Sequence, residues 1–245
     1  MKQLICEKIS GNYSDSSDYK YSLVSLTITN YDIVKAGLGL KKADGLIITT
    51  LKTIKYHMED NFIIGSPGKN EFMILLESNE NDNITLEFVN NVLNEFKNPF
   101  VIDGLEIYVK IAMGVASYDD YSNTQLTIEN ADIVKAYAAE QIESNVQFYK
   151  EDIKNKYLEN IKIKHLLRGA LKKEEIYLTY QPQVDLDSEQ IVGTKALIRW
   201  RSPELGDVSP VGFIPIAEKT GLILSIGEWV LDEALRQNKK WMFLK

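Results

Sequence analysis

Arginine, the side chain best suited to binding a phosphate through two parallel hydrogen bonds, occurs only in the last third of the sequence. The first 167 residues contain none. This distribution disfavours bidentate phosphate recognition in the first part of the chain, although a genome that encodes its basic residues as lysine would produce the same bias. The four arginines are Arg168, Arg199, Arg201 and Arg236.

Three residues of one predicted strand share a face that carries two positive charges. Lys195, Leu197 and Arg199 are two residues apart in the run IVGTKALIRW, and alternate residues of a β-strand project to the same side. An ammonium cannot ligate Mg²⁺ and repels it, so no metal is expected at Lys195. A bland alternative stays open, in which the two charged residues are a solvated pair and Leu197 belongs to a core. The residues that point the other way are Ala196, Ile198 and Trp200.

A turn in the first half carries the other candidate residues. Residues 66–70, Ser-Pro-Gly-Lys-Asn, separate the apolar runs NFIIG and EFMILLE, and proline followed by glycine is typical of a turn. The pattern predicts a β-hairpin with Lys69, Asn70 and Glu71 at its end. Glu71 and Asp44 are isolated carboxylates, and such residues are commonly solvated or cap a helix.

The composition is that of an ordered, acidic protein without disulfides. The chain has 245 residues, of which 44% are hydrophobic and 26% charged, with a net charge of −7. This excludes a disordered tail and gives no broad attraction to nucleic acid. Cys6 is the single cysteine, and with only His57 and His165 there is no cluster at zinc-ligand spacing. No segment approaches the roughly 18 apolar residues of a spanning helix, so we expect a cytoplasmic protein whose parent could be membrane-anchored.

Strands and helices alternate in a way that predicts two unequal domains of an α/β protein. Residues 151–175 are rich in lysine and glutamate with apolar residues at helical spacing, which predicts a linker helix between domains 1–150 and 176–245. The second domain has too few elements to close, so we expect the chain to be a fragment of a larger protein or the product of a truncated gene. The expected elements are a strand at 21–29, a helix capped by Asn30 that resumes after Gly39, the hairpin, a helix at 84–97, a second hairpin turned by Asp103-Gly104, a helix at 124–142, the strand NVQFY, the linker helix, the strands YLTYQPQV and IVGTKALIRW, and one long helix from Phe213 to Met242.

Four motifs in the last third resemble the opening of an EAL domain, the cyclic di-GMP phosphodiesterase barrel. They are YQPQVDL, IVGTKALIRW, SPVGFIPIAEKTGLI and IGEWVLDEA, in that order. The resemblance implies the first strands of a TIM-like barrel, with Gln181, Leu197 and Arg199 at positions that contact the dinucleotide. The family uses the glutamate of its E-x-L-x-R signature as a metal ligand, and Lys195 stands there. Cyclic di-GMP binding in a complete barrel remains open, whereas hydrolysis by this chain is not expected.

The preceding part resembles a GGDEF domain, the diguanylate cyclase fold, through the hairpin EFMILLE after GKN, the ADGL stretch and ADIVKAY. An intact member would use Mg²⁺, but no cofactor is expected here, because Thr27 and Asn70 stand at the two metal-carboxylate positions. Lys69 replaces the second signature glycine. Of the guanine-contacting positions, one reads Lys35 and the other keeps Asp44, so GTP binding is not expected. A remnant nucleotide site at Asp44 and Glu71 is the open alternative, and the product-inhibition motif falls on Glu59 and Phe62 and is absent.

Three functions follow as hypotheses. The chain is a non-catalytic regulatory part of a cyclic di-GMP signalling protein, with a degenerate GGDEF domain and the start of an EAL domain. Alternatively, it is part of a cyclic di-GMP phosphodiesterase in which the GGDEF-like domain is allosteric. In the third, it is a structural module that forms a homodimer through the linker helix and the apolar C-terminal helix. Further signalling domains of a longer protein are expected as partners.

Overall fold

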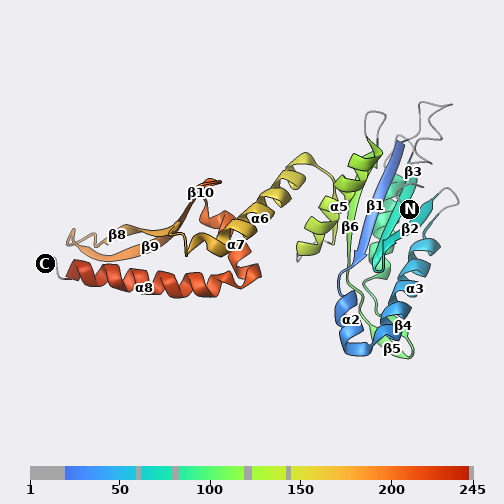
Figure 1. Cartoon of the computed structure of the whole chain (residues 1–245), viewed down its shortest axis with the longest axis horizontal. Coiled ribbons are helices and arrows are strands. Elements are labelled where there is room, and N and C mark those ends of the chain that lie inside the picture. The colour runs from blue at the N-terminus through green and yellow to red at the C-terminus, as the bar shows by residue number, and fades with distance from the viewer. Residues whose placement is uncertain (1–19, 59–61, 79–82, 119–122, 142–144, 243–245) are drawn as a thin grey trace. The chain divides into compact units, whose positions relative to one another are not determined.

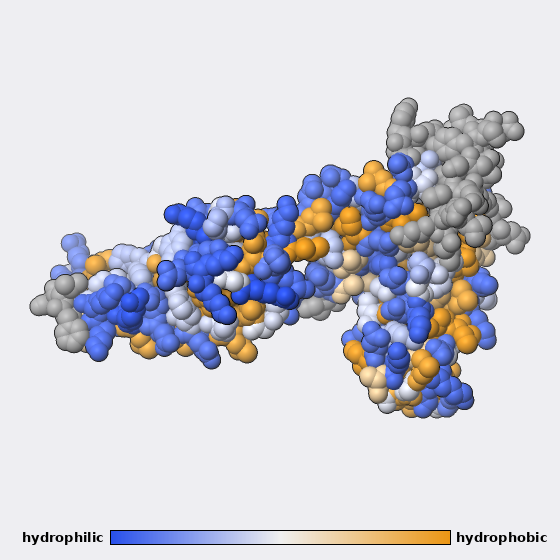
Figure 2. Space-filling model, viewed as in Figure 1, coloured by the Kyte–Doolittle hydropathy of each residue, from blue (hydrophilic) through white to orange (hydrophobic). Residues whose placement is uncertain are grey.

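The computed structural model describes residues 20–58, 62–78, 83–118, 123–141 and 145–242 (Figure 1). The chain divides into two compact units, Met1–Tyr157 and Leu158–Lys245, whose boundary falls inside a helix. Cys6 and Glu59 lie outside the described residues. Among the described helices none is long and apolar enough to cross a membrane. Hydrophilic residues predominate on the face seen in Figure 2, with hydrophobic ones scattered among them.

The first unit contains a five-stranded sheet whose centre is β1. Its strands are β1 (Lys20–Ile28), β2 (Ile63–Gly68), β3 (Glu71–Ser78), β6 (Ile111–Tyr118) and β7 (Val146–Phe148), and their order is β2-β3-β1-β6-β7. β1 runs antiparallel to both β3 and β6, and β7 runs parallel to β6. The central strands are apolar on both faces, as strands covered on both sides should be.

Helices cover both faces of this sheet. On one face α2 (Tyr31–Leu38), α3 (Leu40–Tyr56) and α4 (Asn83–Glu95) share a core with every second residue of β1, among them Leu26. On the other face α5 (Thr124–Glu140) packs on the intervening residues of the strands. The alternation of β1 therefore sets which side chains reach α5.

The hairpins predicted from the turns are confirmed. β2 and β3 pair across the first turn, and β4 (Phe100–Ile102) pairs with β5 (Leu105–Ile107) as a separate two-stranded sheet. Asp103 and Gly104 both have positive φ, 50° and 75°, as a type I′ turn requires.

The prediction that Asn30 caps the following helix is wrong. Asn30 occupies the position before α2, but its side chain makes no capping hydrogen bond. Instead its amide donates to the carbonyl oxygen of Tyr108, and its oxygen accepts from the backbone N–H of Lys110, each at 2.9 Å. The side chain therefore ties the end of β1 to the start of β6, because two unpaired backbone groups there offer it partners.

The second unit consists of a three-stranded sheet and helices. β8 (Ile176–Val184), β9 (Ile191–Ser202) and β10 (Gly206–Val208) form antiparallel pairs in the order β10-β9-β8. The turn between β8 and β9 is short, and it joins the two strands as an antiparallel hairpin. The linker helix α6 (Glu151–Ala170) ends five residues earlier than the predicted limit at 175.

The single long helix predicted from Phe213 to Met242 is wrong, because two helices occupy this region. α7 (Pro210–Thr220) ends at Gly221, which has the left-handed φ of 75°, and α8 (Leu222–Met242) begins directly afterwards. A glycine adopts this conformation without steric cost and so commonly ends a helix. Phe213 of α7 is buried against Trp200 of β9, with their ring centroids 5.6 Å apart.

The beginning of α6 is fastened to α5 by aromatic and polar contacts. The rings of Tyr137 and Tyr157 meet edge to face at 6.2 Å, and the ammonium of Lys154 lies 3.4 Å from the side-chain oxygen of Asn130. The hydroxyl of Tyr149 donates to the Glu151 carboxylate. That hydrogen bond, aided by burial and by the carboxylate charge, raises the pKa of Tyr149 to about 12.

We expect the stability of the first unit to fall in a defined alkaline range. Because the folded state raises the Tyr149 pKa above its ordinary value of 10.0, the contribution is complete below pH 10 and is lost as the pH rises through about 12. Urea unfolding of the wild type and of Tyr149→Phe between pH 9 and 12 tests this. The difference between the two free energies of unfolding should shrink above pH 10, and a constant difference would contradict the assignment.

Candidate functional site

The predicted hairpin turn lies beside the central strand on the side of α5. Thr27 of β1 is directly opposite Glu71 of β3 in the register, and both belong to the set of residues that face α5. Lys69 and Asn70 form the turn that precedes Glu71. Three of the sequence-predicted positions, Thr27, Asn70 and Glu71, therefore come together.

The polar groups of Thr27 and Asn70 are occupied by the hairpin itself. The amide of Asn70 donates to the carbonyl oxygen of Ile28 at 2.9 Å, and the backbone N–H of Ile28 donates to the Asn70 carbonyl at the same distance. The hydroxyl of Thr27 donates to that carbonyl as well, at 3.4 Å. These bonds fasten the turn to the end of β1.

Glu71 is held by a buried lysine of α5. The ammonium of Lys135 lies 3.1 Å from a carboxylate oxygen of Glu71 and 3.0 Å from one of Asp132, and only 9% of the lysine side chain is exposed. The other partner of Asp132 is the hydroxyl of Ser25 on β1, which donates to it at 2.7 Å. These four residues, Ser25, Glu71, Asp132 and Lys135, are called the α5 ion cluster below.

A glycine allows α5 to approach the sheet closely enough for this cluster. Gly114 of β6 is directly opposite Ser25, and a Cβ atom placed on it would lie 2.1 Å from the carbonyl oxygen of Ala131 and 2.4 Å from the backbone nitrogen of Lys135. Only a residue without a side chain fits there. The turn of α5 from Ala131 to Lys135 therefore lies directly on the strand.

The remaining positions carried over from the resemblance do not join this group. Lys35 and Asp44 are exposed on α2 and α3, and Lys69 is exposed at the turn. Phe62 is half-buried and meets Phe88 of α4 edge to face at 5.8 Å, so it has a packing role. The ammonium of Lys135 instead contacts Glu71 and Asp132.

The residues at the hairpin do not fit a divalent metal. Thr27 and Asn70 offer neutral oxygens that already take part in hydrogen bonds, and the one carboxylate, Glu71, is paired with an ammonium. Mg²⁺ prefers carboxylates, water and phosphate in an octahedral arrangement, and a fixed ammonium repels it. Throughout the described ranges no three acidic, histidine or cysteine side chains gather as a metal site would require.

The second group of candidates lies on one face of the β8-β9 hairpin. Gln181 is directly opposite Lys195, and Leu197 and Arg199 follow on the same face of β9, as the spacing predicts. Gln181 and Lys195 are exposed, whereas Leu197 and Arg199 are half-buried. The guanidinium of Arg199 donates to the carbonyl oxygen of Ile198 at 2.8 Å. The opposite face, with Ile198 and Trp200, packs into the core of the unit.

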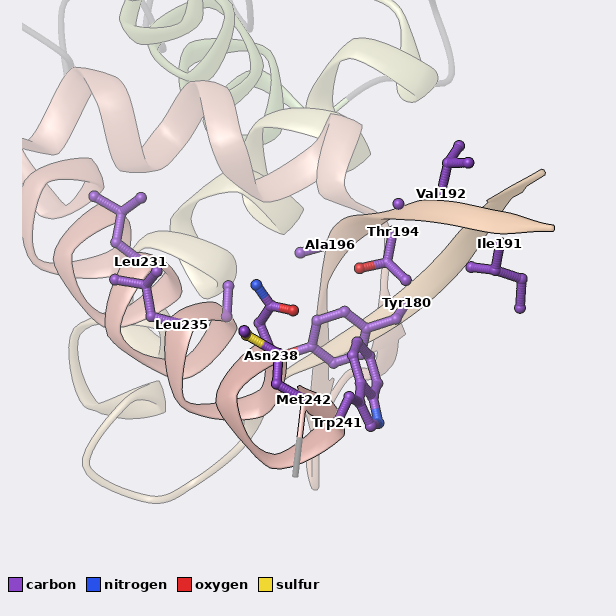
Figure 3. Close-up of a pocket in the computed structure, with 12 residues that line it drawn as sticks. Tyr180, Ile191, Val192, Thr194, Ala196, Leu231, Leu235, Asn238, Trp241 and Met242 are labelled. Carbon is purple, nitrogen blue, oxygen red and sulfur yellow. The ribbon is translucent and has the colours of Figure 1, made fainter. Parts of the chain in front are cut away.

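An apolar groove of about 620 Å³ lies between the β8-β9 hairpin and α8 (Figure 3). Tyr180 and Trp241 meet edge to face at 4.9 Å at one end, and Leu231 and Leu235 of α8 line the other. Burial raises the pKa of Tyr180, and Glu233 adds to this rise. Because Tyr180 alternates with Gln181, the groove lies on the face of the hairpin opposite to the predicted ligand-binding residues.

Sequence reasoning missed Ser25, Asp132, Lys135 and Gly114. The sequence did offer one signal. Lys135 falls at helical spacing on the same face of α5 as Ile128, Ala131 and Ala138, which are all buried. A lysine in a buried helical stripe needs a carboxylate partner, and Asp132 lies three residues earlier on the same helix. The partner on β3 could not be found without the register of the sheet.

The comparisons with known proteins identify both parts of the chain. Residues 2–145 match the family model described as "Diguanylate cyclase, GGDEF domain", and residues 165–245 match the EAL domain model. The chain is 32% identical to the bifunctional diguanylate cyclase/cyclic di-GMP phosphodiesterase MucR of Pseudomonas aeruginosa, over 92% of this chain and 33% of that protein. It is 28% identical to the cyclic di-GMP phosphodiesterase PdeR of Escherichia coli, over 98% of this chain and 36% of the relative.

A comparison with solved structures also finds a GGDEF-like fold for the first unit. The GGDEF domain of TpbB (YfiN) from Pseudomonas aeruginosa superposes with a TM-score of 0.55 at 13% identity, over 63% of this chain and 90% of that one. At this identity the likeness concerns the fold alone. The chain spans about a third of the length of the two curated relatives. The chain belongs to the GGDEF domain family, and its GGDEF domain is followed by a segment of an EAL domain.

Proposed function

We propose that this chain is a non-catalytic regulatory part of a cyclic di-GMP signalling protein. Its GGDEF domain is degenerate and makes no cyclic di-GMP, and its EAL segment contributes a dinucleotide-contacting face without the metal glutamate. The domains extend over residues 1–150 and 176–245, and the linker of 151–175, which is helical as far as Ala170, connects them. The signalling context is supported by the two relatives, a bifunctional diguanylate cyclase/cyclic di-GMP phosphodiesterase and a cyclic di-GMP phosphodiesterase.

The observation that carries the proposal is the state of the hairpin turn. Cyclic di-GMP synthesis, in which a ribose hydroxyl attacks the α-phosphate of GTP and pyrophosphate leaves, needs a divalent ion held by carboxylates to neutralise the developing charge. At the two metal-carboxylate positions stand Thr27 and Asn70, whose polar atoms form hydrogen bonds that fasten the hairpin. The neighbouring carboxylate, that of Glu71, is paired with the ammonium of Lys135. These side chains hold the hairpin turn in place, but they do not supply a metal site.

The direct test is a cyclase assay on the full chain. Incubation with GTP and Mg²⁺ or Mn²⁺, followed by chromatography of the nucleotides, should give no cyclic di-GMP above a control without protein. A relative with an intact GGDEF signature serves as the positive control. Formation of cyclic di-GMP by this chain, abolished when the residues at the turn are mutated, would overturn the proposal.

The EAL segment is proposed to contribute binding and not hydrolysis. Gln181, Leu197 and Arg199 project from one face of the β8-β9 hairpin, and Lys195 supplies a positive charge where a metal ligand is needed for hydrolysis. In a complete barrel we expect cyclic di-GMP to bind without Mg²⁺. Because a hydrogen bond from a charged donor contributes about 1.5–3 kcal/mol, Arg199→Ala should weaken binding by roughly 10-fold or more.

Calorimetric titration with cyclic di-GMP of a protein that contains the complete barrel, in EDTA and in Mg²⁺, measures this affinity. The control is Arg236→Ala, whose guanidinium pairs with Glu233 on α8 and not with the β9 face. Equal weakening by both variants would contradict the proposed face. Turnover of cyclic di-GMP by the wild type, lost on Arg199→Ala, would favour the phosphodiesterase alternative.

The structural dimer alternative is supported by one observation. The apolar groove beside α8 exposes Leu231 and Leu235, 66% and 67% accessible, on a face that ordinarily needs a covering layer. Light scattering at several protein concentrations tests for self-association. A dimer that forms with increasing protein concentration, and to the same extent with and without cyclic di-GMP, would support this alternative over the regulatory one.

A further inference from the structure

A lysine ammonium is an expensive group to bury, and α5 encloses one beside the degenerate turn. The side chain of Lys135 is 9% exposed, while those of its partners Glu71 and Asp132 are 39% and 34% exposed. A buried charge persists only when it is paired and hydrogen-bonded. The most deeply enclosed charge of the cluster is thus the cation.

We propose that Lys135 is a built-in cation, which stands in place of a divalent ion and holds carboxylates of β3 and α5 together without Mg²⁺. Its ammonium holds the β3 carboxylate of Glu71 and the α5 carboxylate of Asp132 together. The same function is given to a bound ion in a site that joins carboxylates from separate elements. Here the cation is covalently part of the chain.

The register explains why the lysine replaces an ion at this place. Glu71 is directly opposite Thr27, the position at which the family carries a metal-binding carboxylate, so the ammonium that contacts Glu71 lies beside that position. The close packing of α5 on Gly114 fixes the backbone of Lys135 against the sheet. The lysine side chain therefore begins at a fixed place and reaches Glu71 on β3.

The charges of the α5 ion cluster favour Lys135 alone over Lys135 together with a divalent ion. Lys135 balances one of the two carboxylates, and the hydroxyl of Ser25 donates a further hydrogen bond to Asp132. A divalent ion approaching the same carboxylates would meet the ammonium at short range, where repulsion is several times stronger than in bulk water. The wild-type site should therefore exclude Mg²⁺ and Mn²⁺.

The inference rests on the proposed absence of a metal at the turn, and stability and ion binding test it separately from cyclase activity. In the full chain the first unit of Lys135→Met should melt about 5 °C or more below the wild type, because two carboxylates lose their shared partner. The matched control, Lys52→Met, removes an exposed lysine of α3 and should leave the melting temperature nearly unchanged. Lys135→Arg keeps the charge and should restore part of the loss.

Addition of 10 mM MgCl₂ in place of EDTA should leave the wild-type melting temperature unchanged and raise that of the smaller variant Lys135→Ala. If Lys135→Ala does not fold, the wild-type melting temperatures in MgCl₂ and in EDTA decide the test. Calorimetric titration of the wild type with MnCl₂ should give no binding, whereas Mn²⁺ binding that Glu71→Gln removes would overturn the inference. So would a Lys135→Met protein as stable as Lys52→Met. Cyclase activity in GTP and Mg²⁺ would instead refute the proposed function, whatever the stability measurements give.

Discussion

Gly114→Ala is expected to unfold or severely loosen the GGDEF domain. The added Cβ would lie 2.1 Å from the carbonyl oxygen of Ala131 and 2.4 Å from the nitrogen of Lys135, and both are backbone atoms that cannot rotate away. α5 must therefore move off the strand, which separates Lys135 from Glu71 and opens the core beneath Ile128. We expect a loss of about 3 kcal/mol or more in the free energy of unfolding, larger than ordinary overpacking costs.

The matched control for this substitution is Gly37→Ala. Gly37 lies within α2, and a Cβ placed on it meets nothing within 4 Å. Because alanine has a higher helix propensity than glycine, this variant should be as stable as the wild type or more stable by about 0.5–1 kcal/mol. Urea unfolding followed by circular dichroism compares the three proteins. Equal stability of Gly114→Ala and the wild type would mean that α5 does not pack on the strand as described.

The fold of the first unit could be predicted from local patterns. Period-two alternation located the central strand, and Pro67-Gly68 and Asp103-Gly104 indicated both hairpins, because turn chemistry depends on neighbouring residues alone. The first turn itself falls at Lys69-Asn70, since β2 extends to Gly68. The spacing of Lys195, Leu197 and Arg199 also predicted their common face. Their role in binding stays a prediction.

Features that depend on distant partners could not be predicted. Asn30 was expected to cap a helix, but the free backbone groups of Tyr108 and Lys110 compete for its side chain. The long C-terminal helix was expected to be continuous, because an isolated glycine is tolerated within a helix and only φ at Gly221 shows that it ends one. Lys135 meets Glu71 across 64 residues of sequence.

The two sites that we propose to be degenerate share a chemical change. Lys135 pairs with Glu71 beside Thr27, where the family carries a metal-binding carboxylate, and Lys195 stands at such a position on β9. Under the proposed function a fixed positive charge would replace an exchangeable one in each case, which would remove Lewis-acid catalysis while keeping attraction for anions. The difference is that Lys135 is enclosed by carboxylates, whereas Lys195 is exposed and able to meet a ligand. This contrast supports a structural role for the first and a binding role for the second.

Trp200→Ala is expected to unfold the second unit while the first unit remains folded. The Trp200 side chain is 1% exposed, meets Phe213 edge to face, and donates from its indole nitrogen to the Glu175 carboxylate at 3.0 Å. Truncation of a buried aromatic residue costs about 3–5 kcal/mol, which is comparable to the whole stability of a small unit. Loss of this anchor would also release Arg199, because its neighbour Trp200 fixes the direction of the predicted ligand-binding face of β9.

Limited proteolysis of the full chain separates this effect from a general loss of stability. The Trp200→Ala protein should be cleaved rapidly after the linker helix and leave a resistant fragment of the first unit. The control is Trp241→Ala, which removes a half-buried indole that packs on Tyr180 near the end of α8 and should cost far less, since less surface is buried there. If both variants are digested equally, the core of the second unit is not centred on Trp200. If the first unit is digested together with the second, the two units unfold as one, and the linker helix transmits stability between them.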